Sequence, residues 1–167
     1  ESGSYNVYLG YNSGSNNAGS HNINMGYDAG KCNTTGSRNI AMGCLAMEGA
    51  SSSGGTGSDN IFMGYSAGKA VTSASCNIAM GYAAGSNFTS ASNNVIIGEY
   101  AGNSADQVKC NVFIGKCAGK STVWGSSCQG YSNIYIGNEA AKNATTAFEN
   151  IVIGDRAAGG GTMTGKR

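Results

Sequence analysis

The chain has 167 residues, a formal net charge of +1 and only 11% charged residues, together with 28 glycines and no proline. This length fits one domain, and the lysines are spread singly, so there is no basic patch that could neutralise nucleic-acid phosphates. No apolar run is long enough to span a membrane as a helix. We therefore expect a single domain, 1–167, with no nucleic acid as partner and no membrane span.

A ten-residue phrase, written CNIAMGYAAG at 76–85, returns nine times along the chain. Each copy has an Asn, a branched aliphatic, a variable residue, a second aliphatic, a Gly, two variable residues and a small pair. The copies begin at Asn6, Asn22, Asn39, Asn60, Asn77, Asn94, Asn111, Asn133 and Asn150. A repeat of this length is typical of stacked repeat proteins. The regular aliphatics argue against a disordered chain, despite the abundance of Gly, Ser and Asn.

In chain order, the first two repeats set the pattern, and the third loses its closing Gly before a Gly/Ser-rich insertion at 51–58. Repeats four to six are regular. The seventh leads into a second insertion, STVWGSSCQG, at 121–130, and the last two replace the final Gly of the phrase with Ala. We expect residues 160–167, a Gly-rich end, to form a flexible tail.

Each phrase contains a short alternating stretch rich in Val, Ile and Phe, bounded by Gly, which predicts a β-strand. No apolar stripe with helical spacing survives the glycines. About a dozen polar residues separate successive strands, which rules out tight hairpins and favours parallel stacking. The sequence therefore predicts an all-β protein, a parallel β-solenoid or β-roll of nine coils of roughly 17 residues.

We number positions from the leading Asn, which is position 0. The aliphatics at +1 and +3 are expected to point into the coil, so the alternation directs +2 outward. Position +2 is nevertheless mostly apolar, and a strand apolar on both faces should be covered on both. This predicts self-association, as a trimer or a filament, through Tyr8, Phe62, Ile96, Phe113, Tyr135 and Val152. The alternative is that the coil folds a second sheet over this face.

The Asn and the Gly of the phrase occur in all nine copies. The Asn side chains are expected either to form a ladder of amides along the stack or to act as turn residues at strand entry. The Gly at +4 is expected to supply a backbone angle closed to other residues. The small residue at +7 indicates a tight inside corner.

Two further rows follow the strands. Tyr11, Tyr27, Tyr65 and Tyr82 occupy position +5, where they are either structural or a row that binds sugar rings. Asn33, Asn87 and Asn143 lie in N-x-S/T sequons ten or eleven residues after the leading Asn. They are expected to project from one edge, where they would be glycan acceptors in a secreted eukaryotic protein and plain loop residues otherwise.

Six cysteines fit disulfides and an oxidising, extracellular location, while buried reduced thiols are the alternative. The chain begins with Glu1, which fits either a removed leader or a fragment of a longer protein. Spacing favours a Cys110–Cys128 pair, with Cys32–Cys44 as a second suggestion. Cys76 and Cys117 are then left for pairing between subunits.

Nothing in the sequence predicts an enzyme, a metal site or a cofactor. The only histidine is His21, the cysteines do not follow C-x-x-C spacing, and the carboxylates are scattered without a pair at equivalent phase in adjacent coils. Phosphate-loop and calcium-binding nonapeptide motifs are absent.

The phrases NIAMGYAAG and NVFIGKCAG resemble the repeats of bacteriophage tail-fibre-type proteins and the head repeats of trimeric autotransporter adhesins. The resemblance runs from Tyr5 to Gly159. It implies a parallel β-roll, usually trimeric, that serves as an extracellular fibre or adhesive stalk. We therefore expect a structural, homo-oligomeric fibre subunit, and as the alternative a phage or bacterial surface adhesin that binds glycans through its loops or its tyrosine row.

Overall fold

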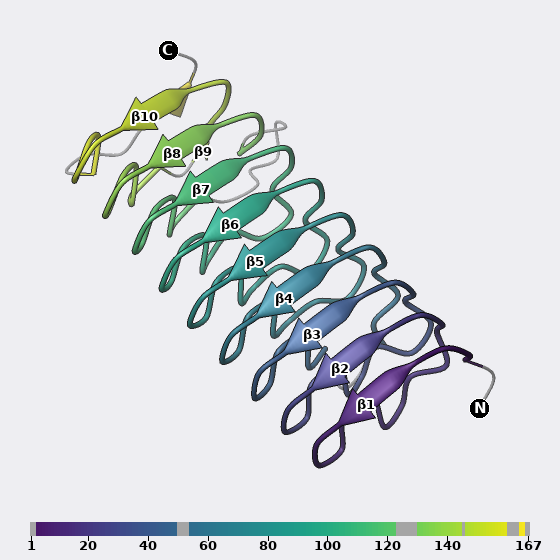
Figure 1. Ribbon diagram of the computed structural model, residues 1–167. Coiled ribbons are helices and arrows are strands. Elements are labelled where there is room, and N and C mark those ends of the chain that lie inside the picture. Colours follow the sequence, from purple (N-terminus) through teal and green to yellow (C-terminus); the bar gives the residue numbers. More distant parts are fainter. Residues whose placement is uncertain (1–2, 50–53, 123–129, 145, 160–163, 166–167) are drawn as a thin grey trace.

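The computed structural model describes residues 3–49, 54–122, 130–144, 146–159 and 164–165, and there the protein is all-β without helices (Figure 1). Nine strands form one parallel sheet in the order β1-β2-β3-β4-β5-β6-β7-β8-β10. Their bounds are β1 Val7–Leu9, β2 Ile23–Met25, β3 Ile40–Met42, β4 Ile61–Met63, β5 Ile78–Met80, β6 Val95–Ile97, β7 Val112–Ile114, β8 Ile134–Ile136 and β10 Ile151–Ile153. The predicted parallel β-solenoid is confirmed.

Equivalent residues of successive repeats are paired along the whole sheet. Ile61 of β4 lies opposite Ile78 of β5, which lies opposite Val95 of β6. The longer third and seventh repeats do not disturb this register, because Ile40 still pairs with Ile61 and Val112 with Ile134. The extra length of these two repeats therefore leaves the pairing of the strands unchanged.

The chain's end contributes a second, two-stranded sheet. β11 (Thr164–Gly165) pairs in parallel with β9 (Thr146–Ala147), one repeat earlier. Within the tail that was expected to be flexible, these two residues thus continue the stack. The remaining tail residues lie outside the described part of the chain.

The predicted inward and outward faces of the strands are reversed in the structure. Position +2 points into the coil: Phe62, Ile96 and Phe113 are fully buried, and so is Tyr135. Positions +1 and +3 point outward and are exposed or half-buried. The prediction that Tyr8, Phe62, Ile96, Phe113, Tyr135 and Val152 form the self-association surface is therefore wrong. Only Tyr8, in the first repeat, is substantially exposed, at 39%.

The leading asparagines explain this reversal. Each Asn is directed into the coil, so the alternation along the strand places +2 inside and +1 and +3 outside. The Asn77 amide donates to the Oδ1 atom of Asn60 at 3.0 Å and to the carbonyl of Ala91 at 2.9 Å, in the segment that leads into the next strand. Asn94 repeats this pattern with Asn77 and Val108. The amide ladder is thus the correct one of the two predicted roles, and it ties each strand to the segment that leads into the next one.

Side chains of complementary size fill the narrow interior. Position +2 is large in the fourth repeat, where Phe62 lies inside, and small in the fifth, where Ala79 lies inside. In that fifth repeat the return segment supplies Phe88, which is fully buried. Because a coil of this size has room for about one large group, a small residue at +2 is balanced by a large one opposite.

The Gly at +4 ends every strand. Gly81 has a φ of 133°, and a Cβ atom there would lie 2.6 Å from the carbonyl oxygen of Gly98 in the next repeat. A side chain at this position would thus separate the stacked turns. The predicted role of this Gly, a special backbone angle with close backbone approach, is confirmed.

Candidate self-association surface

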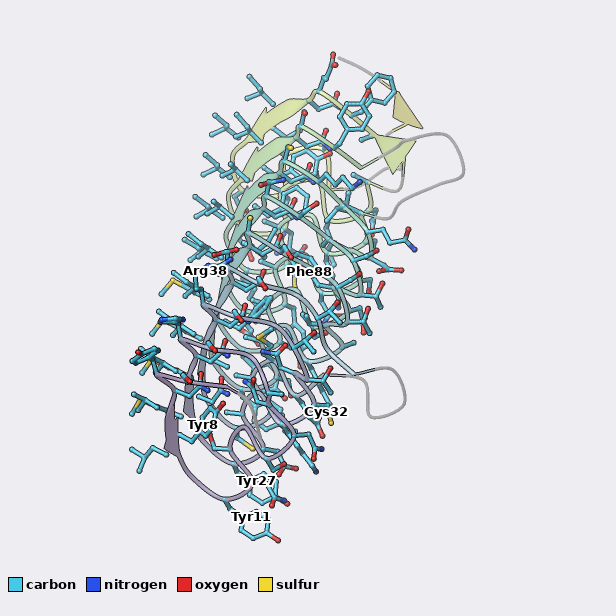
Figure 2. The ribbon with its side chains drawn as sticks, turned by 90° about the vertical axis from the view of Figure 1, so that its right-hand side faces the viewer. Tyr8, Tyr11, Tyr27, Cys32, Arg38 and Phe88 are labelled. Carbon is cyan, nitrogen blue, oxygen red and sulfur yellow. The ribbon has the colours of Figure 1, made fainter. Side chains whose placement is uncertain are left out.

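The outer face of the nine-stranded sheet is covered by two columns of aliphatic side chains. Position +1 carries Val7, Ile23, Ile40, Ile61, Ile78, Val95, Val112, Ile134 and Ile151, and position +3 carries Leu9, Met25, Met42, Met63, Met80, Ile97, Ile114, Ile136 and Ile153. All eighteen are exposed or half-buried. Figure 2 shows side chains projecting from this side of the sheet along its length.

This face contains no polar residue at either position in any repeat. A solvated sheet face normally carries polar and charged side chains. In other proteins, exposed apolar patches of this extent are typical of interaction sites. With strands about 4.8 Å apart, nine strands make it roughly 40 Å long.

A third column, at position −1, borders the strip at the start of each strand. It comprises Tyr5, His21, Arg38, Asp59, Cys76, Asn93, Cys110, Ser132 and Glu149, all of them exposed. Every one has a positive φ, between 55° and 62°. These residues directly precede the buried Asn and are exposed beside the start of each strand, and we call these nine residues the edge column.

Neighbours in the edge column interact along the stack. The Tyr5 and His21 rings stack with their centroids 5.0 Å apart. Arg38 donates two hydrogen bonds to the carboxylate of Asp59, at 2.6 and 2.8 Å. The hydrogen bond from Arg38 lowers the pKa of Asp59 below its usual range, because it favours the ionised carboxylate.

The tyrosine row lies at the turn after each strand, and Tyr11 and Tyr27 project there, away from the outer face of the sheet (Figure 2). All four predicted row members are exposed. Their rings stack in pairs, Tyr11 on Tyr27 at 5.4 Å and Tyr65 on Tyr82 at 5.1 Å. Because each pair covers one face of each of its rings, less ring face is open for a sugar.

The cysteines are distributed differently from the prediction. Cys32 is buried in a return segment and Cys44 lies in the turn of the tyrosine row, and both are free, so the suggested Cys32–Cys44 disulfide is wrong. Cys117 is also buried, which removes it from pairing between subunits. Cys76 and Cys110 are exposed in the edge column. Cys128, the predicted partner of Cys110, lies outside the described residues.

The three sequons do not share one environment. Asn87 and Asn143 are exposed, as an edge position requires. Asn33 is 1% exposed, and its Nδ2 atom donates to the carbonyl of Gly36 at 3.2 Å. A glycan therefore cannot be attached to Asn33 in the folded protein, and the expectation that this residue projects from the edge is wrong.

Other kinds of site have little support in the described part of the chain. It contains no group of three or more His, Cys, Asp or Glu side chains placed to hold a metal ion, and no helix that could cross a membrane. A hollow of about 480 Å³ lies at the first repeat, lined by residues that include Asn6, Tyr8 and Ser13.

Comparison of the chain with protein-family models, with curated proteins and with solved structures gave no match.

Proposed function

We propose that this protein is a structural subunit of an extracellular fibre and that it self-associates through the outer face of its sheet. The observation that carries the proposal is the pair of aliphatic columns at +1 and +3, which run unbroken through all nine repeats. Burying such a strip contributes roughly 25 cal/mol for each Å² of apolar surface removed from water.

A second copy of the chain is the partner that fits this surface best. The strip is a straight row of identical spacing, and another copy offers the same spacing, the same width and the same lack of charge. Two sheets can pack face to face about 10 Å apart with their side chains interlocked. The extracellular setting rests on the cysteine content and on the resemblance to fibre repeats, and both support it as part of the proposal.

Glycan binding by the tyrosine row is a weaker second proposal. The exposed rings favour it, while their mutual stacking leaves less aromatic surface for a sugar. We therefore prefer self-association through the outer face of the sheet to glycan binding by the tyrosine row at the turn.

The test is to place charges in the middle of the strip. The double variant Met63→Lys/Met80→Lys puts two half-exposed ammonium groups on adjacent strands, where the monomer tolerates them and a packed interface does not. We expect at least a tenfold weaker association in analytical ultracentrifugation. Ser73→Lys, an exposed position in a return segment, is the matched control and should leave association unchanged.

A wild-type chain that sediments as a monomer at high concentration would rule out the proposal. Equal thermal melting of the double variant and the control would show that the fold is intact, so that any change in association arises at the sheet face.

A further inference from the structure

We infer that the chains associate as an antiparallel pair, in which outer face packs on outer face and Cys76 of each copy forms a disulfide with Cys110 of the other. This inference rests on the proposed function, because it specifies how the same apolar face is covered. It starts from the two exposed thiols of the edge column.

Cys76 and Cys110 occupy the same position in the fifth and seventh repeats, with Asn93 between them. They stand two strands apart, roughly 10 Å, which is beyond the reach of a disulfide within one chain. Both thiols border the apolar strip. A partner that covers the strip therefore brings its own edge column close to them.

The symmetry of the pair decides which residues meet. A two-fold axis along the direction of β6 turns the second sheet over onto the first and reverses the order of the repeats. The two edge columns then face each other, with the fifth repeat opposite the seventh and the sixth opposite itself. Cys76 of each copy thus lies opposite Cys110 of the other, twice in the pair. A two-fold axis along the stack would instead send the edge columns to opposite sides.

The other members of the edge column are complementary in the same register. Arg38 in the third repeat, which pairs with Asp59 of its own chain, lies opposite Glu149 in the ninth, so opposite charges face each other at both ends of the contact. Asp59 meets the hydroxyl of Ser132, and Asn93 meets its own copy, whose amide can both donate and accept. No like charges face each other.

A competing register places the axis along β5. It would overlap all nine repeats and set Cys76 opposite Cys76, but it would leave Cys110 facing Arg38. With the axis along β6, only repeats three to nine of the two copies overlap, which is seven repeats instead of nine. We favour this register because it joins both exposed thiols and does not set Cys110 against the Arg38 guanidinium.

The size of the contact explains why covalent bonds are useful. Seven strands of the strip with the edge column measure about 34 by 15 Å, which amounts to about 1,000 Å² buried in the pair. This area is at the low end for a specific interface. The two disulfides require the edge columns to approach to within about 7 Å between Cα atoms, closer than the mean spacing of packed sheets. The disulfide that joins the two sheets of immunoglobulin domains shows that such a local approach is possible. Two such bonds prevent a modest contact from dissociating.

The oxidation is ordinary thiol–disulfide exchange with a small-molecule disulfide. The Cys76 thiolate attacks the disulfide and releases one thiol, and Cys110 of the second copy then attacks the mixed disulfide and releases the other. Each pair of protein thiols loses two protons and two electrons, and the small molecule is reduced to two thiols.

The test uses the full chain in a Cys44→Ser/Cys128→Ser background, which removes one half-exposed thiol and the thiol outside the described residues. We expect oxidised glutathione to convert it to a covalent dimer on non-reducing gels, with peptide mass spectrometry showing Cys76 joined to Cys110. Cys76→Ser and Cys110→Ser, made separately in this background, should each abolish the covalent dimer.

Ultracentrifugation of both serine variants separates this inference from the proposed function. If they self-associate and show no disulfide, the covalent register is supported. A Cys76–Cys76 link that survives in Cys110→Ser overturns the register and supports association through the face. A trimer without any disulfide would likewise overturn the register and support association through the face. A monomer in all forms overturns both proposals.

Discussion

At the scale of single residues, the leading Asn has more structural roles than any other position in the repeat. In the sixth repeat, the Oδ1 atom of Asn94 accepts hydrogen bonds from the backbone and the side chain of Asn111, both at 3.0 Å. Its amide nitrogen donates to Asn77 and to Val108. These bonds are buried, so the loss of one side chain leaves groups unsatisfied in both neighbouring repeats, including the Val108 carbonyl in the segment before β7.

Replacing Asn94 with Ala is therefore expected to lower the free energy of unfolding by about 3 kcal/mol, since several buried donors and acceptors lose their partner. Urea unfolding followed by circular dichroism measures this loss. The control is Asn87→Ala, an exposed asparagine outside the ladder, with an expected change within about 0.5 kcal/mol. Equal stability of the two variants would contradict a structural ladder.

At the scale of one strand and its coil, the interior is set by the +2 side chain and the return segment. Asn24 in β2 is the polar exception among the +2 residues that lie inside. Its side chain is fully buried, and neither its amide nitrogen nor its oxygen has a hydrogen-bond partner among the described residues. A polar group buried in this way costs free energy that an apolar group of similar shape would not.

Asn24→Leu should therefore stabilise the protein, by about 1–2 kcal/mol, because it removes two unsatisfied polar atoms and keeps the same branched arrangement of heavy atoms. The thermal midpoint and the urea midpoint should both rise. The matched control is Asn22→Leu in the same coil, which removes a ladder amide and should destabilise. A lower midpoint for Asn24→Leu would indicate that its amide has a partner after all.

At the scale of the whole molecule, the solenoid is a one-dimensional stack. Every strand of the main sheet contacts only its immediate neighbours. Stability in such a stack is close to a sum of terms between adjacent repeats, and opening begins at the ends. The outer strands β1 and β10 have one neighbour each in the sheet, whereas β5 has two.

Hydrogen exchange followed by mass spectrometry should show this gradient. Amides of β4, β5 and β6 are expected to exchange at least tenfold more slowly than those of β1, because opening the centre breaks contacts on both sides. The Met63→Lys/Met80→Lys variant should keep the gradient in the monomer, since its substitutions lie on the outer face. Uniform protection along the stack would point to all-or-none unfolding of the molecule.

The sequence by itself determined the number of strands in the main sheet, their parallel stacking and the position of the turns. The reason is that these depend on a period: nine copies of one phrase, each with an aliphatic stretch and a Gly at +4, can satisfy one another only when they are stacked in register. The sequence did not decide between two roles for the leading Asn, the amide ladder and a turn residue, because an Asn at strand entry suits either role.

Only the tertiary structure decided which strand face lies inside. The regular aliphatics at +1 and +3 suggested a core, and the variable +2 position suggested a surface. In the folded chain a small +2 residue is balanced by a large side chain from the return segment, as Ala79 is by Phe88 in the fifth repeat, so the interior varies in sequence. The constant aliphatic columns lie outside. The apolar surface open to a partner is therefore the strip that includes Met63 and Met80, not Phe62 and Tyr135.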